Sequence, residues 1–104
     1  MFERLKSVYP HEAVTQIFFG LMENSEFREK FISRYEYIVD NYVNTEKLLE
    51  QIELFESTYR SEVKRHIARW RYPDTMQVWQ DIVNGLKNFA QKRPKIVLEQ
   101  LKAL

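Results

Sequence analysis

The scarcity of glycine and proline constrains the fold of this 104-residue chain more than any other feature of its sequence. The chain has 2 glycines and 3 prolines, whereas ordinary proteins contain roughly 7% glycine and 5% proline. Sandwiches and barrels need many tight turns, which these residues supply, so an all-β fold is not expected. Gly20 and Gly85 are also far apart, which excludes a glycine-rich loop for binding nucleotide phosphates.

Apolar residues recur at helical spacing along most of the chain, which predicts a single all-α domain over residues 1–104. Pro94 either kinks the last helix or begins another one, so we expect a bundle of four to five helices. The apolar pattern continues to Leu104 without a polar tail, which indicates a truncated C-terminus. The four long helical runs are expected at residues 12–22, 27–42, 48–70 and from about 74 onward.

Residues that favour helix ends stand at the breaks between these runs. Asn24 and Asn44 are expected to cap the helices that follow them, and Asp74 with Gln77 resembles a capping box. Gly85 lies inside the last long run, where it could permit a close helix contact. The core face of that run is expected to consist of Val78, Trp79, Ile82, Val83, Leu86 and Phe89.

The composition excludes several kinds of chemistry. The chain has no cysteine, so it has no disulfide, no thiol nucleophile and no cysteine-ligated zinc or iron–sulfur cluster. An apolar fraction of 44% with a net charge of +1 argues against disorder and against a general attraction to polyanions or membranes. No apolar run approaches the roughly 18 residues of a membrane span, and the N-terminus lacks the apolar segment of a secretory signal. These features leave the cellular compartment open.

The charges are unevenly placed although they nearly cancel. Residues 36–56 carry six acids and one base, whereas residues 60–71 carry five bases and one acid. Arg60, Lys64 and Arg71 are therefore candidates for a basic contact surface that could bind phosphates. The sequence pI of about 8.0 is below that of typical nucleic-acid-binding domains. A solvated helix face or an intramolecular charge partner is the favoured interpretation, and nucleic acid is not an expected partner.

Two other patterns resemble active-site or metal-site spacing. His66 follows Glu62 by four residues, a spacing that can bring two ligands to one metal, but the other histidine is distant in sequence. We expect His66 to be a buried or half-buried histidine with a satisfied hydrogen bond. Glutamates at helical spacing could share a proton, but such spacing is typical of a solvated helix surface. The glutamates concerned are Glu46, Glu50 and Glu53.

The two tryptophans, Trp70 and Trp79, flank the turn at Pro73. Large aromatic side chains contribute strongly both to cores and to interfaces. We expect them to pack the third long helix against the fourth, and the alternative is that one of them anchors a partner.

The order of several motifs resembles the late helical region of the CotH kinase-like family of bacterial spore-coat-protein-H-type proteins. An Asn-x-x-Phe-Arg start leads into a long helix, followed by a His-x-x-x-Trp element, a further tryptophan and a Phe-x-x-x-Arg element. The resemblance covers roughly residues 12–104. The positions that carry it are Asn24, Phe27, Arg28, Phe31, Arg34, His66, Arg69, Trp70, Trp79, Phe89 and Arg93.

The resemblance implies a helical scaffold that is a C-terminal subdomain or fragment of a larger protein, similar to an atypical ATP-dependent protein kinase. Such proteins use ATP and a divalent metal, whose binding residues lie upstream of this helical region. We therefore expect no catalytic, cofactor-binding or metal-binding residue in this chain. The expected partner is the remainder of the parent chain or another protein, and self-association through an uncovered apolar face is possible. The alternative is a free-standing helical module for protein–protein interaction.

Overall fold

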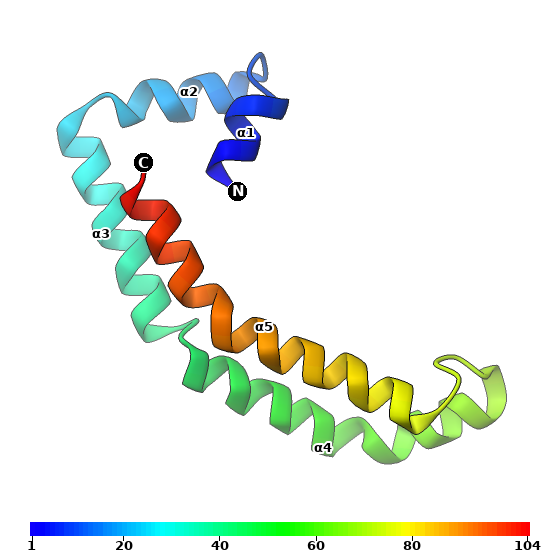
Figure 1. The fold of residues 1–104 in the computed structure, drawn as a ribbon. Coiled ribbons are helices and arrows are strands. Elements are labelled where there is room, and N and C mark those ends of the chain that lie inside the picture. The colour runs from blue at the N-terminus through cyan, green and yellow to red at the C-terminus, as the bar shows by residue number, and fades with distance from the viewer. The chain divides into compact units, whose positions relative to one another are not determined.

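The computed structural model describes residues 1–104 and contains five α-helices and no strands (Figure 1). The predicted all-α class is confirmed. None of the helices combines the length and apolarity that a membrane span requires. The elements are α1 (Phe2–Val8), α2 (Ala13–Met22), α3 (Ser25–Asn41), α4 (Thr45–Trp70) and α5 (Met76–Lys102).

The helices divide into two compact units, which are described separately. Unit 1 consists of Met1–Asn41 and Lys95–Leu104, and unit 2 is Tyr42–Pro94. Helix α5 passes through Pro94 without a break, so the alternative of a separate last helix is wrong. The first helix, α1, was not predicted, because seven residues are too few to show a helical period.

Local capping explains where the helices begin and end. Asn24 Oδ1 accepts the backbone N–H of Phe27 at 3.0 Å, and Asn44 Oδ1 accepts that of Lys47 at 2.9 Å. Both predicted caps are confirmed. Helix α5 is instead capped by the hydroxyl of Thr75, which accepts the N–H of Val78 at 3.2 Å. The predicted capping box at Asp74 is therefore wrong by one residue.

Helix α4 ends where Arg71 enters the left-handed region. Its φ is 52°, and its N–H donates to the carbonyl of Ile67 at 2.8 Å. A residue in this conformation at the position after a helix satisfies a terminal carbonyl and turns the chain away. The following Tyr72 and Pro73 then cannot continue the helix, because proline disfavours helical geometry in the residue before it.

The core of unit 1 is an aromatic cluster. The ring of Phe2 lies 6.0 Å from that of Phe18, 6.3 Å from Phe31 and 6.2 Å from Tyr35, measured between centroids. Phe18 and Phe31 are closer still, at 5.1 Å. These contacts join α1, α2 and α3. The most buried side chains of the unit are Phe2, Thr15, Met22, Val39 and Leu101.

Unit 2 is a helical hairpin of α4 and the first part of α5, which run side by side (Figure 1). The hydroxyl of Thr45 donates to the carbonyl of Ala90 at 2.9 Å, which fixes one end of the pair. Only Val83 and Ala90 of this unit are buried, and α4 has no buried residue. The expected core face of α5 is therefore wrong in part, because Val78, Ile82, Leu86 and Phe89 are exposed. A helix with one neighbour can bury only the side chains on the line of contact.

Removing the Asn24 cap should lower stability. We expect Asn24→Ala to reduce the free energy of unfolding by about 1 kcal/mol, because the N–H of Phe27 loses its acceptor. Urea unfolding followed by circular dichroism measures this change. Glu23→Ala, at the exposed residue before the cap, is the control, and an equal loss in both variants would contradict the capping role.

Candidate functional site

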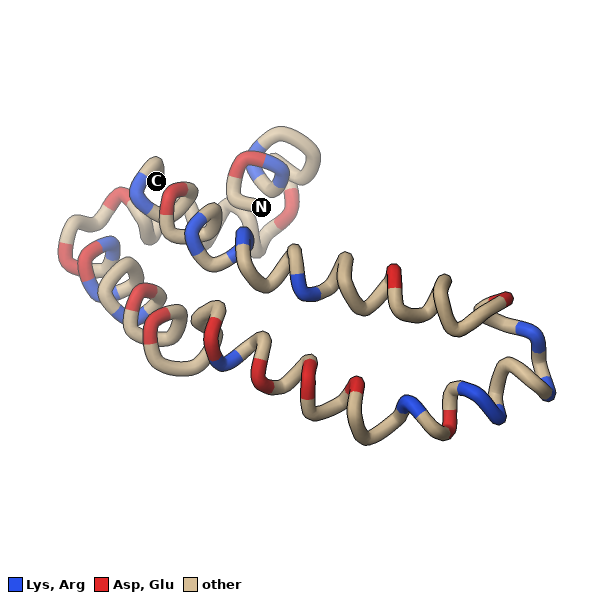
Figure 2. Tube along the Cα trace, turned by 60° about the horizontal axis from the view of Figure 1, so that its bottom comes forward, with Lys and Arg blue, Asp and Glu red and all other residues tan.

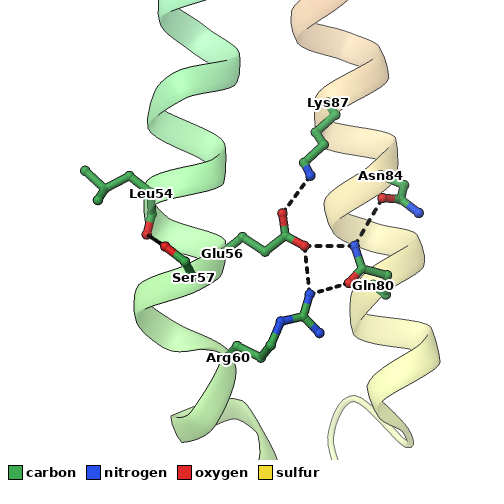
Figure 3. Close-up of polar contacts among 7 residues, drawn as sticks. All are labelled: Leu54, Glu56, Ser57, Arg60, Gln80, Asn84 and Lys87. Atoms are coloured by element: carbon green, nitrogen blue, oxygen red, sulfur yellow. Dashed lines mark hydrogen bonds and ion pairs between the residues drawn. The ribbon is translucent and has the colours of Figure 1, made fainter.

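The most connected polar group of unit 2 surrounds the carboxylate of Glu56. This Glu56 cluster consists of Glu56 and Arg60 on α4 with Gln80, Asn84 and Lys87 on α5 (Figure 3). The carboxylate accepts from Lys87 Nζ at 2.7 Å, Arg60 Nη2 at 2.8 Å and Gln80 Nε2 at 3.0 Å. The cluster therefore ties the two helices together by polar contacts.

The contacts within the cluster are shared. Gln80 Oε1 accepts from Arg60 Nη2 at 2.6 Å, and Gln80 Nε2 also donates to Asn84 Oδ1 at 3.1 Å. The Glu56 side chain is only 13% exposed, and that of Lys87 is 27% exposed. Lys87 and then Gln80 hold the pKa of the Glu56 carboxyl below its ordinary value of 4.5, with a smaller contribution from Arg60. Glu56 is thus held in its charged form, which suits a structural clamp and not a proton donor.

The lowered pKa of Glu56 gives a pH dependence of known sign. A carboxyl whose pKa is lower in the folded state stabilises the fold above its unfolded pKa, near 4.5, and this contribution is lost as the pH falls through the lowered value. We expect Glu56→Gln to lower the midpoint of thermal unfolding at pH 7, and the difference from the wild type to shrink as the pH falls below 4.5.

The matched control is Glu50→Gln, since Glu50 is an exposed glutamate on the same helix. Its unfolding midpoint should differ little from the wild type at every pH. Thermal unfolding of all three proteins by circular dichroism makes the comparison. A Glu56→Gln difference that does not depend on pH would contradict the assignment.

The Glu56 cluster was not predicted from the sequence. Glu56 and Arg60 stand four residues apart on one helix, a spacing that favours an ion pair. Lys87 was the stronger sign of such a cluster in the sequence. It follows the expected core residue Val83 by four residues, so it stands on the same face of the helix. A cation at a helix contact needs a partner on the neighbouring helix.

The three residues of the predicted basic contact surface have different surroundings in the structure. Arg60 belongs to the Glu56 cluster and also stacks over the ring of Trp79, with 5.1 Å from Cζ to the centroid. Arg60 therefore forms an intramolecular ion pair with Glu56. Lys64 and Arg71 are exposed. Figure 2 shows acids along the first half of α4 and bases along its second half, which matches the preference of a helix dipole.

Two predictions at the end of α4 are wrong. His66 is exposed and not half-buried, and Trp70 is 62% exposed and does not pack α4 against α5. The guanidinium of Arg69 lies over the Trp70 ring at 4.9 Å, which gives this side chain a local partner instead of a core. His66 and Arg69 line an open depression on α4 together with Tyr59, Glu62, Val63 and Arg65.

The motif residues of α3 belong to unit 1. Asn24 caps the helix, and Phe27 stacks on Phe31 at 6.3 Å within the aromatic cluster. Arg28 Nη2 donates to the backbone carbonyl of Leu104 at 2.6 Å. Arg34 lies over the ring of Tyr37 at 5.2 Å. Each of these residues therefore contacts another residue of unit 1.

The motif residues of α5 lie in unit 2. Trp79 is half-buried beneath Arg60, Phe89 is exposed, and Arg93 is half-buried. No group of three or more histidines, aspartates or glutamates in the chain is arranged to hold a metal ion. The three glutamates at helical spacing, Glu46, Glu50 and Glu53, are exposed, as predicted for a solvated helix surface.

A pocket in unit 1 is about 250 Å³ in volume and has a balanced charge. It is lined by the acids Glu3 and Glu23 and by the bases Lys6 and Arg28, together with apolar side chains. Arg28 is engaged with the Leu104 carbonyl, and Lys6 lies over the ring of Phe19 at 5.3 Å. The pocket offers no excess charge for an ionic ligand.

Comparison with known proteins identifies one family. The family model described as CotH kinase protein matches residues 3–97. No curated protein and no solved structure matches the chain significantly. The family match includes residues of all five helices.

Proposed function

Because the chain belongs to the CotH kinase protein family, we propose that it is a helical scaffold region that buttresses the catalytic lobe of such a protein or presents a contact surface to another protein. The match over residues 3–97 carries the proposal. The interactions of the described side chains support it, because Asn24, Arg28 and Glu56 act through structural hydrogen bonds.

The surface that we assign to this role is the exposed apolar stripe of α2. Val14, Ile17 and Leu21 stand at spacings of three and four residues on one face, and all three are exposed. A row of large apolar side chains in water is a common mark of a protein contact. In this proposal the α2 stripe packs against the catalytic lobe.

The scaffold role predicts that the chain has no kinase activity alone. We expect isothermal titration of the purified chain with ATP and Mg²⁺ to give no binding in the micromolar range. Incubation with labelled ATP and a protein substrate should transfer no phosphate. Binding or transfer by the purified chain would contradict the proposal.

The contact itself is tested with the segment encoded upstream of Met1 in the open reading frame, expressed as a separate polypeptide. It should bind the chain, and Ile17→Asp should abolish binding, whereas Leu54→Asp, on exposed α4 surface, should not. A reading frame that begins at Met1 would overturn the scaffold proposal.

The second candidate is a free-standing protein-interaction module. The specific observation in its favour is the end of α4, where Trp70 is 62% and Tyr72 is 75% exposed. Aromatic side chains of this kind are frequent anchors of protein interfaces. The Trp70→Ala variant of such a module should no longer bind its partner, whereas the Ile17→Asp variant should still bind it. The scaffold proposal predicts loss of binding for Ile17→Asp, so this variant distinguishes the two candidates.

A further inference from the structure

One side of the unit 2 hairpin is apolar and uncovered. Each of its five large side chains is between 52% and 60% exposed. A groove of about 190 Å³ runs between the helices on this side and places Phe55 and Tyr59 of α4 beside Leu86 of α5. Phe55 and Tyr59 also stack on each other at 6.0 Å. We call this surface the hairpin face: Phe55, Tyr59, Ile82, Leu86 and Phe89.

Gly85 lies at the edge of the hairpin face, next to Leu86, and the fold of the chain does not explain it. A side chain added at Gly85 would meet no atom within 4 Å, so no neighbouring helix in the chain requires the glycine. Glycine inside a helix is disfavoured relative to other residues. Its position lets the backbone of another helix approach α5 closely from outside.

The charges beside Gly85 are self-complementary. Asp81 precedes Gly85 by four residues and Lys92 follows it by seven, so all three share one side of α5. Both charged side chains are exposed. Two copies of α5 that cross antiparallel near Leu86 would place each Asp81 beside the Lys92 of the other copy. A parallel arrangement would oppose like charges.

We propose that the hairpin face binds the same face of a second copy of this chain, with the two α5 helices antiparallel and related by a two-fold axis near Leu86. Two helical hairpins joined in this way make a four-helix arrangement, in which apolar side chains of all four helices face one another. The inference is independent of the proposed contact of α2, because the two surfaces lie on different helices.

The size of the face sets the expected affinity. Five side chains that are about half exposed leave on the order of 500 Å² of apolar surface per copy, or about 1,000 Å² in a dimer. This area is below the roughly 1,200–2,000 Å² of stable specific interfaces and is typical of weak, transient ones. We therefore expect a reversible dimer with a dissociation constant in the micromolar range.

Sedimentation equilibrium of the purified chain from about 5 to 500 µM tests the proposal. The wild type should shift from monomer to dimer and no further. Leu86→Arg should remain monomeric over this range, whereas Leu54→Arg, exposed but outside the hairpin face, should dimerise like the wild type. A monomeric wild type, open-ended assembly, or a dimer that survives Leu86→Arg would overturn the proposal.

Two further variants keep the test valid if Leu86→Arg is unstable. Gly85→Gln introduces a good helix former into open space within the chain, so it should raise the unfolding midpoint of the monomer and weaken the dimer at least about tenfold. A Gly85→Gln chain that dimerises with wild-type affinity would overturn the close approach of the two α5 helices.

A charge exchange tests the antiparallel arrangement. Asp81→Lys alone and Lys92→Asp alone should each weaken the dimer about tenfold, because like charges then oppose one another twice across the two-fold axis. The double variant should restore the wild-type dissociation constant. Failure of the double variant to restore it would overturn the arrangement. Ile17→Asp should leave the dimer unchanged, which separates this outcome from a failure of the scaffold proposal.

Discussion

Replacing Phe2 with alanine should lower the free energy of unfolding by about 3–5 kcal/mol. Phe2 is 8% exposed, and its ring contacts Phe18 of α2 and both Phe31 and Tyr35 of α3. Alanine removes all three ring contacts and leaves a cavity among aromatic side chains, which cannot collapse easily to fill it. Urea unfolding measures this loss of stability. It is followed by circular dichroism and by the near-ultraviolet signals of the phenylalanine and tyrosine rings.

The matched control is Val8→Ala at the other end of α1. Val8 is 55% exposed, so its truncation should change stability by less than about 0.5 kcal/mol. Both variants introduce alanine, which is a good helix former. A difference in stability between them therefore reports the packing of α1 and not its helix propensity. Equal effects of Phe2→Ala and Val8→Ala would show that α1 does not complete the aromatic cluster.

The helices that could be predicted from the sequence are the ones determined by short-range interactions. Helix α3 was expected over residues 27–42 and runs Ser25–Asn41, and its cap at Asn24 was identified correctly. A cap involves residues three positions apart, and an amphipathic stripe repeats within one helix. Neither depends on what the rest of the chain does, which is why both were visible in the sequence.

Burial was predicted less well than helix positions, because it depends on how many neighbours a helix has. Ile82 and Phe89 lie on the apolar side of α5 as expected, yet both are exposed, since the hairpin covers only the line through Val83 and Ala90. Trp70 is exposed for the same reason. An apolar stripe in a sequence indicates that a face is suited to burial, but it does not identify the surface that buries it.

The Glu56 cluster shows the corresponding limit for polar groups. Its ion pair between Glu56 and Lys87 joins residues 31 positions apart at 2.7 Å on different helices. The ion pair of Glu56 with Arg60 on the same helix could be anticipated from their spacing. The partners on α5 depend on the register between the two helices, which side-chain packing determines. The same register brings Thr45 to Ala90.

Leu101→Ala should also be strongly destabilising, by about 2–5 kcal/mol. Leu101 has an exposed fraction of 0% although it lies three residues before the end of the chain. Terminal helical turns usually fray, and a frayed turn would lose little on truncation of one side chain. Here Arg28 holds the end of unit 1 by donating to the Leu104 carbonyl at 2.6 Å, so the cavity left by alanine remains enclosed.

The roles of burial and of the Arg28 contact can be separated. Leu98→Ala, at a half-buried leucine one turn earlier in α5, should cost clearly less than Leu101→Ala when both are measured by urea unfolding. In an Arg28→Ala background the end of the chain is released, so the cost of Leu101→Ala should fall toward that of Leu98→Ala. An unchanged cost in that background would mean that apolar packing alone retains the last turn, because the two substitutions would then be independent.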